Sequence, residues 1–254
     1  MSAPKGTLYL VPNTLDFGVA GAGSALDDVL PLGALRRAAA LTHWVCENAK
    51  TTRAFLKRVD AVVPLAAPLQ SLSLLELPRP PKGRPTAAPV DLGALLAPAL
   101  AGHDVGLISE AGLPAVADPG ALLVDAAHRL GVAVVPLAGP SSLLLALAAS
   151  GLDGQSFAFV GYLPVGAPER AARIRELEDL SRRLGQTQLM IETPYRNPAL
   201  LAALVERLAP ATRLSVSCGL TLPGAFTRSD RVADWRRSPT TLPADVPAVF
   251  AFAA

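Results

Sequence analysis

The sequence predicts an α/β fold built from two domains. Hydrophobic residues make up 51% and charged residues 17% of the 254 residues, which is typical of a folded chain that buries a substantial core. Short apolar or β-branched runs alternate with longer segments of helix formers, and this alternation is the pattern of α/β proteins. A chain of this length has room for two compact lobes, which we expect to span residues 1–138 and 139–254.

Strands and helices alternate in the first half of the chain. The expected strands are short apolar runs bounded by turn residues: Thr7–Val11, Thr42–Cys46, Val105–Ile108 and Val132–Val135. The expected helices are rich in helix formers: Pro31–Ala40, Thr51–Val59, Asp91 to about Leu100, and Ala121–Leu130. Pro31 and Pro119 suit the first turn of a helix, and Asp91 and Asp118 are typical N-cap residues.

The stretch from Pro64 to Pro89 is predicted to be an irregular loop beside a ligand cleft. Prolines surround the basic segment Lys82-Gly83-Arg84 within it. Because proline lacks a backbone N–H and fixes φ, such a run disfavours a regular helix or a central strand.

The uncharged stretch from Gly131 to Leu152 is about as long as a membrane-spanning helix. Pro136 and the Gly139-Pro140 pair interrupt it, and proline disrupts a helix interior. We therefore expect the strand Val132–Val135, then a helix that starts near Ser141, and no membrane-spanning segment.

The second half of the chain continues the alternation. After an aromatic segment at 157–162, the expected elements are a charged helix Glu169–Arg183, a strand through Met190-Ile191, a helix Pro198–Leu208, and strands Leu214–Cys218 and Val246–Phe252. We expect strand and helix to alternate to the end of the chain, without internal repeats.

The charge balance is nearly even, with a net charge of +2 that neither requires nor excludes RNA. Four cations cluster on the predicted helix 51–59 and just before it: Lys50, Arg53, Lys57 and Arg58. A solvated helix face and an RNA contact both remain open for this cluster.

Familiar cofactor and metal motifs are absent. Gly21-Ala22-Gly23 resembles the start of a dinucleotide fingerprint, but Leu26 takes the place of its third glycine. No metal site is expected, because the histidines lack partners at ligand spacing: His43, His103 and His128. Cys46 and Cys218 are predicted to be buried free thiols. The amino-terminal residues lack a signal-peptide core, which favours a cytoplasmic protein.

The loop Ser109–Pro114 follows the buried strand Val105–Ile108 directly. Ligands of open parallel sheets bind beyond the carboxyl ends of the strands, so this loop is the first candidate for a ligand site. The residues alone name no ligand.

Several loops, taken in order, resemble one known family. The segment 109–120 is similar to the SDAGTPxxSDPG signature of the bacterial 16S ribosomal RNA cytidine 2′-O-methyltransferases, a branch of the tetrapyrrole methylase superfamily. Other segments resemble motifs of this branch in the same order: Cys46-Glu47-Asn48 with Thr52-Arg53, 137–141 with Ser150-Gly151-Leu152, 159–164, and 192–196. Together they cover most of residues 8–196.

The resemblance implies an S-adenosyl-L-methionine-dependent methyltransferase with the cofactor in the cleft between two α/β domains. Carried over by position, the cofactor-binding residues would be Glu110, Gly112, Leu113, Ser141, Ser142, Met190, Cys218, Gly219 and Pro247. From the residues alone, helix capping is the alternative role of Ser141 and Ser142. The resemblance also implies a homodimer.

A sulfonium methyl group is already activated, so the protein mainly has to align the acceptor for in-line attack. A general base helps when the acceptor is a hydroxyl, and the candidates are Glu110 and Glu192. Each carboxylate could instead bind the cofactor or make a structural hydrogen bond.

Three functions remain open. The first is ribose methylation of ribosomal RNA in the small ribosomal subunit, favoured by cations near the expected cleft: Arg53, Lys57, Lys82 and Arg84. The second is methylation of a tetrapyrrole or another small molecule, and the third is cofactor binding with lost catalysis. Asn48 replaces the Asp of the branch's motif. It is one of several positions where this chain differs from the branch, and these differences fall mainly on the side expected to bind the substrate.

Overall fold

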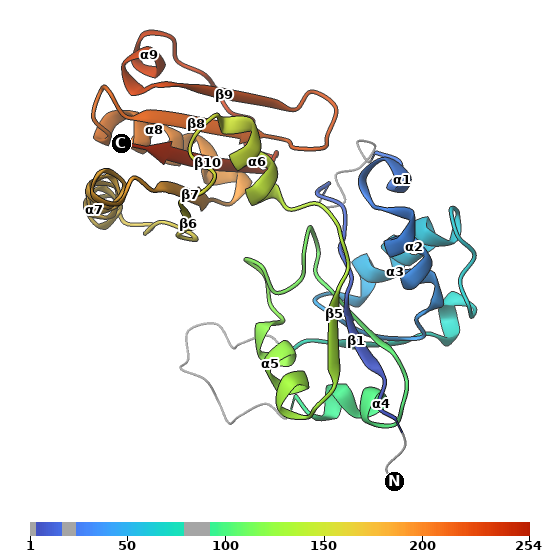
Figure 1. Cartoon of the computed structure of the whole chain (residues 1–254). Coiled ribbons are helices and arrows are strands. Elements are labelled where there is room, and N and C mark those ends of the chain that lie inside the picture. The colour runs from blue at the N-terminus through green and yellow to red at the C-terminus, as the bar shows by residue number, and fades with distance from the viewer. Residues whose placement is uncertain (1–3, 17–23, 79–91) are drawn as a thin grey trace. The chain divides into compact units, whose positions relative to one another are not determined.

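The computed structural model describes residues 4–16, 24–78 and 92–254 (Figure 1). The chain divides into two compact units, Met1–Pro140 and Ser141–Ala254. Each unit has a five-stranded sheet of its own.

The sheet of the first unit is parallel throughout, in the order β3-β2-β4-β1-β5. Its strands are β1 (Thr7–Leu10), β2 (His43–Cys46), β3 (Ser73–Glu76), β4 (Val105–Ile108) and β5 (Ala133–Pro136). β4 lies between β1 and β2, and Leu8 and His43 both pair with Val105. The carboxyl ends of these three strands therefore meet at one edge of the sheet.

Helices cover both faces of this sheet. They are α1 (Leu26–Val29), α2 (Leu32–Ala40), α3 (Ala49–Asp60), α4 (Ala97–Leu100) and α5 (Ala121–Arg129), with short 3-10 turns at Leu69–Ser71 and Ala94–Leu96. Trp44 packs with α2 and α3 on one face, whereas its neighbour Val45 packs with α4 and α5 on the other. Successive side chains of a strand point to opposite faces, so both faces of β2 are buried.

The sheet of the second unit is mixed, in the order β6-β7-β10-β8-β9. Its strands are β6 (Phe157–Phe159), β7 (Thr187–Ile191), β8 (Arg213–Cys218), β9 (Phe226–Arg231) and β10 (Ala248–Ala253). Only β6 and β7 pair in parallel, and β10 is antiparallel to both β7 and β8. The helices are α6 (Ser142–Ser150), α7 (Ala167–Leu184), α8 (Asn197–Arg207) and α9 (Val232–Arg237), with a 3-10 turn at Pro194–Arg196.

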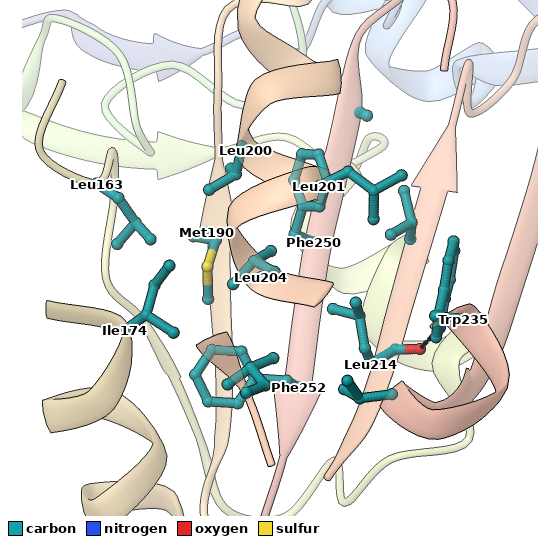
Figure 2. Packing of buried hydrophobic residues seen from close by; sticks show 14 of the residues in the cluster. Leu163, Ile174, Met190, Leu200, Leu201, Leu204, Leu214, Trp235, Phe250 and Phe252 are labelled. Atoms are coloured by element: carbon teal, nitrogen blue, oxygen red, sulfur yellow. Dashed lines mark hydrogen bonds between the residues drawn. The ribbon is translucent and has the colours of Figure 1, made fainter. Parts of the chain in front are cut away.

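The main core of the second unit lies between this sheet and α7, α8 and α9 (Figure 2). Phe250 and Phe252 point into it from β10, and the Trp235 Nε1 atom donates a hydrogen bond to the Leu214 carbonyl at 2.9 Å. The intervening residues Val249 and Ala251 pack on the opposite face, against α6.

The predicted α/β class is confirmed, and the uncharged stretch 131–152 divides into β5 and α6 as expected. Among the described residues, no helix combines the length and the apolar character needed to cross a membrane.

Other expectations were wrong. Ser73–Glu76 is an edge strand within the predicted loop. Among the described strands it pairs with β2, and three of its four side chains are exposed, so its sequence lacks the apolar run of a buried strand. Residues 79–89 of that loop and the predicted cap Asp91 lie outside the described residues, as does Gly21-Ala22-Gly23.

Two predictions about the order and the ends of elements were also wrong. Strand and helix do not alternate throughout, because β8 is followed by the antiparallel, polar strand β9 without a helix between them. Asp118 is not the cap of α5, whose N-cap is Gly120 with a φ of 132°.

Candidate functional site

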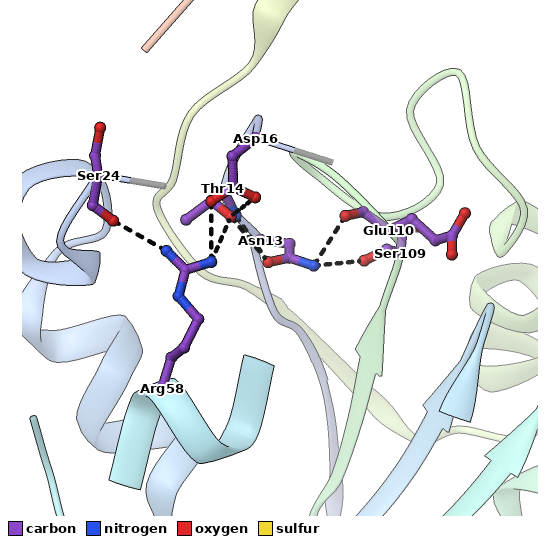
Figure 3. Close-up of polar contacts among 7 residues, drawn as sticks. All are labelled: Asn13, Thr14, Asp16, Ser24, Arg58, Ser109 and Glu110. Carbon is purple, nitrogen blue, oxygen red and sulfur yellow. Dashed lines mark hydrogen bonds and ion pairs between the residues drawn. The ribbon is translucent and has the colours of Figure 1, made fainter. Parts of the chain in front are cut away.

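Three loops meet at the carboxyl edge of the parallel sheet, after β1, β2 and β4. Asn13, in the loop after β1, joins two of them (Figure 3). Its Nδ2 atom donates hydrogen bonds to the Ser109 carbonyl at 3.1 Å and to the Glu110 carbonyl at 3.0 Å. Asn13 is buried, so these bonds hold the predicted ligand loop against β1.

A short antiparallel bridge strengthens this junction. The Asn13 N–H donates to the Gly112 carbonyl at 2.8 Å, and the Gly112 N–H donates to the Thr14 carbonyl at 3.3 Å. Gly112 has a φ of 65°, a conformation that disfavours side chains. Gly112 therefore allows the chain to turn close to β1 while it keeps both backbone bonds.

The loop continues in an unusual backbone conformation. Ala115 and Ala117 have φ values of 67° and 62°, which are uncommon for residues with a side chain and cost about 1 kcal/mol each. Such conformations persist only where the surroundings hold them, and they are frequent at ligand sites.

Carboxyl groups from two strand ends gather around this loop. Glu47 follows β2, and its Oε2 atom accepts a hydrogen bond from the Glu110 N–H at 3.2 Å. Partial burial, together with the carboxylates of Glu47 and Glu110, raises the pKa of Asp118 to about 7. The loop thus places a carboxyl group that changes its protonation near neutral pH beside Glu110.

An ion pair ties the loop after β1 to helix α3 (Figure 3). The Arg58 Nη1 atom lies 2.9 Å from the Asp16 Oδ2 atom, and Arg58 Nη2 donates to the Ser24 carbonyl at 3.0 Å. The Thr14 hydroxyl donates to the other Asp16 oxygen at 2.8 Å. The sequence did not predict this ion pair. The only feature that could have pointed to it is the carboxylate of Asp16, which lies just beyond the first strand.

A cavity of about 190 Å³ opens between these loops and α3. Its lining comes from three segments of the first unit: Asn13, Asp16, Thr51, Ala54, Phe55, Arg58 and Glu110. Of the predicted site residues of the first unit, Glu110 lines this cavity, while Gly112 and Leu113 follow it in the same loop.

In the second unit, Ser141 and Ser142 stand at the start of α6. Ser141 occupies the N-cap position, but its side chain makes no capping hydrogen bond. The capping role that the sequence left open for Ser141 is therefore wrong.

The other predicted cofactor residues of the second unit gather at one end of its sheet. The Gly219 N–H donates to the Pro247 carbonyl at 2.9 Å, and Cys218 pairs with Ala248 in the adjoining strand. Burial raises the pKa of the Cys218 thiol, with a further contribution from Asp245. Met190 lies in β7 opposite Phe250 of β10, and its side chain is buried in the hydrophobic core (Figure 2).

Glu192, the second candidate base, is occupied by neighbouring groups. Its Oε1 atom accepts hydrogen bonds from Arg196 Nη2 at 2.6 Å and from the Thr193 N–H at 2.7 Å. Its side chain is 3% exposed. These contacts favour the structural hydrogen bond that the sequence left as an alternative.

Among the described residues, no group of three or more histidine, cysteine or acidic side chains has the geometry to hold a metal ion. Cys46 and Cys218 are both buried free thiols, as predicted.

Comparison with known proteins points to one family. The family model of the tetrapyrrole (corrin/porphyrin) methylases matches residues 18–233. The chain is 40% identical over 127 residues to ribosomal RNA small subunit methyltransferase I of Mesorhizobium japonicum, which covers 50% of this chain and 42% of that protein. It is 30% identical over 192 residues to the protein of the same name from Halalkalibacterium halodurans, covering 76% of this chain and 57% of the relative. The chain thus spans about half the length of these curated relatives.

Solved structures resemble the chain over nearly its whole length. The uroporphyrin-III-C-methyltransferase of Thermus thermophilus matches with a TM-score of 0.53 at 22% identity, over 98% of this chain and 94% of that one. The methyltransferase CobJ matches with a TM-score of 0.56 at 18% identity, with the same coverage. At 22% and 18% identity, these matches show that the fold is shared and carry no statement about function.

Proposed function

Because the chain belongs to the tetrapyrrole (corrin/porphyrin) methylase family, we propose that it is an S-adenosyl-L-methionine-dependent methyltransferase that acts on ribosomal RNA of the small subunit, at a ribose 2′-hydroxyl. The observation that carries this proposal is the loop after β4. Its sequence resembles the motif of the ribose-methylating branch, and Asn13 and Gly112 hold it at the carboxyl edge of a parallel sheet. The similarity to the small subunit methyltransferases supports the substrate class.

One residue proposed to bind the cofactor has a hydroxyl that suits a ligand with a carboxylate, an amine and ribose hydroxyls. The Ser141 hydroxyl is not used to cap α6, so it can bond to a ligand. Gly112 and Gly219 have positive φ values, and a Cβ atom there would lie 3.3 Å from Leu15 and 3.1 Å from Val246, so glycine lets both proposed cofactor loops pack closely in this conformation. The proposed set also contains Glu110, Leu113, Ser142, Met190, Cys218 and Pro247.

When bound, S-adenosyl-L-methionine supplies a methyl group on a positively charged sulfur, a leaving group that needs no further activation. The work left for this chain is to orient the acceptor hydroxyl and to accept its proton. We assign proton acceptance to Glu110, which lines the cavity, rather than to Glu192, which is held by Arg196. The neighbouring Asp118, with its raised pKa, can relay or hold that proton near neutral pH.

We further propose that the protein works as a homodimer in the cytoplasm, where its proposed substrate is found. The homodimer rests on the family resemblance, and the location rests on the proposed substrate. Sedimentation of the purified chain at several concentrations would test the first of them.

The test of the function has two steps. Titration calorimetry measures binding of S-adenosyl-L-methionine, and transfer of a radiolabelled methyl group is then measured with small ribosomal subunits from cells that lack the protein. We expect binding, transfer, and a Glu110→Gln variant that binds the cofactor but transfers at least tenfold more slowly.

Absence of cofactor binding would refute the whole proposal. Binding without transfer to subunits would refute the RNA substrate and favour a small-molecule acceptor or a cofactor-binding protein without catalysis. Equal transfer rates for wild type and Glu110→Gln would refute only the assignment of the base.

A further inference from the structure

Helix α3 presents three neighbouring stripes of side chains. The inner stripe is buried in the core: Thr52, Phe55, Leu56 and Val59. The second stripe lines the cavity at Glu110: Thr51, Ala54, Phe55 and Arg58. The outer stripe is exposed and begins with three cations, Lys50, Arg53 and Lys57, here called the basic stripe. Asp60 follows on the same face, and its Oδ1 atom accepts a hydrogen bond from the Leu65 N–H at 3.0 Å. Residues three and four apart share a helix face, so the basic stripe runs alongside the cavity.

The basic stripe lacks the partners that a solvated helix face usually has. Within the described part of the chain, no acidic side chain forms an ion pair with Lys50, Arg53 or Lys57. On α7, by contrast, Arg173 pairs with Glu176 and Arg182 with Asp179. Three adjacent cations in a chain of net charge +2 form a local positive patch.

We propose that this face of α3 is the docking surface for the acceptor RNA: Lys50, Arg53 and Lys57 contact its phosphates while the target nucleoside enters the adjacent cavity. This inference rests on the proposed function and adds where the substrate binds. From Lys50 to Lys57 the stripe covers about 10 Å of helix, which equals the axial rise of about three phosphates in one strand of a double helix.

The size and place of the cavity fit a single base. A buried cavity of about 150 Å³ can hold one benzene ring, so a cavity of about 190 Å³ has room for one small aromatic ring system. Glu110 belongs both to the cavity wall and to the proposed cofactor loop, and an acceptor must lie beside the methyl donor.

The ion pair between Arg58 and Asp16 gives this surface a fixed position. It fastens α3 to the loop after β1, which Asn13 fastens to the loop after β4. The phosphate contacts and the reacting group are thereby held on connected elements of one unit, as precise positioning of a substrate requires.

The first experiment removes the stripe. The triple variant Lys50→Gln, Arg53→Gln, Lys57→Gln is compared with a control that loses the same charge elsewhere: Arg36→Gln, Arg175→Gln, Arg183→Gln, all exposed and without ion pairs to described residues. Binding of a fluorescein-labelled single-stranded RNA is measured over a range of salt concentrations. Each lost phosphate contact lowers the slope of log K against log salt by about 0.7, so we expect a drop of about 2 for the stripe variant and much less for the control.

The second experiment blocks the cavity. Ala54 is exposed, lines the cavity, and is replaced by tryptophan; Ala172→Trp on the exposed face of α7 is the control. We expect Ala54→Trp to retain binding of RNA and of S-adenosyl-L-methionine but to lose at least tenfold in methyl transfer to small ribosomal subunits. Circular dichroism and the melting temperature verify that both variants are folded.

The outcomes separate this inference from the proposed function. If wild-type protein transfers methyl groups but the stripe variant has the salt slope of its control, α3 is not the docking surface. If Ala54→Trp transfers as fast as Ala172→Trp, the nucleoside does not enter this cavity. If wild-type protein binds no cofactor, the proposed function itself fails.

Discussion

At the scale of single residues, the site depends on polar groups whose partners are distant in sequence. Asn13 reaches the Ser109 and Glu110 carbonyls, and Arg58 reaches Asp16. Buried polar groups of this kind are costly when a partner is lost, because the remaining group cannot recover its bonds to water. Substitutions at Asp118 and Glu178 measure the cost of burying a carboxyl group and the cost of losing its partners, without any assumption about the ligand.

Asp118 makes the stability of the first unit depend on pH. Its pKa is raised from 3.8 to about 7, so between these values the folded chain binds the proton more tightly than the unfolded chain. The free energy of unfolding therefore falls as pH rises through this window, and the loss is complete above pH 7. Asp118→Asn should remove this dependence and stabilise the protein at pH 8 by about 1 to 2 kcal/mol, a value reduced because the carboxyl is partly open to solvent.

Urea unfolding at pH 5 and pH 8 measures the effect of Asp118→Asn. Asp27→Asn, in an exposed first turn of α1, is the control and should keep the wild-type pH dependence. A variant at Asp118 with an unchanged pH profile would contradict the assigned cause.

Glu178 plays a structural part in the second unit. This buried carboxylate on α7 accepts hydrogen bonds from the Ala209 N–H at 2.8 Å and from the Thr212 hydroxyl. Glu178→Ala leaves both donors without a partner and should lower the free energy of unfolding by about 2 to 3 kcal/mol. Glu178→Gln keeps an acceptor oxygen and should cost less, so equal losses in denaturant unfolding would count against this explanation.

At the scale of elements, close packing of the parallel sheet decides which residues β4 tolerates. Gly106 lies in the middle of β4, beside the ring of Trp44 on β2. β4 is buried along its whole length, so nothing there can relax toward solvent.

Gly106→Ala tests this packing. A Cβ atom at Gly106 would lie 2.7 Å from two Trp44 ring carbons and 3.0 Å from a Leu41 methyl, so the ring must move. We expect a loss of about 1 to 3 kcal/mol in the free energy of unfolding and a changed Trp44 fluorescence. Gly33→Ala on α2, where the added methyl meets no atom within 4 Å, should instead be neutral or slightly stabilising.

At the scale of the whole molecule, the chain has two units with separate hydrophobic cores. Each unit contains one of the two tryptophans, Trp44 in the first and Trp235 in the second, and both are buried. We propose that the units are domains that unfold as separate cooperative blocks.

Single-tryptophan variants test this division. Trp235→Phe leaves Trp44 as reporter of the first unit, and Trp44→Phe leaves Trp235 as reporter of the second. Adding Glu178→Ala to each should shift the denaturation midpoint reported by Trp235 and leave the one reported by Trp44 in place. Equal shifts of both midpoints would mean that the chain unfolds as one block.

The sequence by itself determined the features that depend on neighbouring residues. Hydrophobic periodicity indicated the α/β class, and β4 has the predicted bounds Val105–Ile108 because a buried strand is apolar along its length. The loop after it was predicted to be a ligand site because it directly follows this buried strand, at the edge where ligands of open parallel sheets bind, and this stays a prediction. Pro136 and Pro140 likewise separated β5 from α6.

Only the tertiary structure decided the features that join distant segments. The edge strand Ser73–Glu76 exists because β2 offers it hydrogen bonds, and the antiparallel position of β10 depends on both of its neighbours. The ion pair between Asp16 and Arg58 spans 42 residues, and no local pattern marks those two side chains as partners. Propensities and motifs act over a few residues, whereas strand pairing, burial and ion pairs depend on which segments the fold brings together.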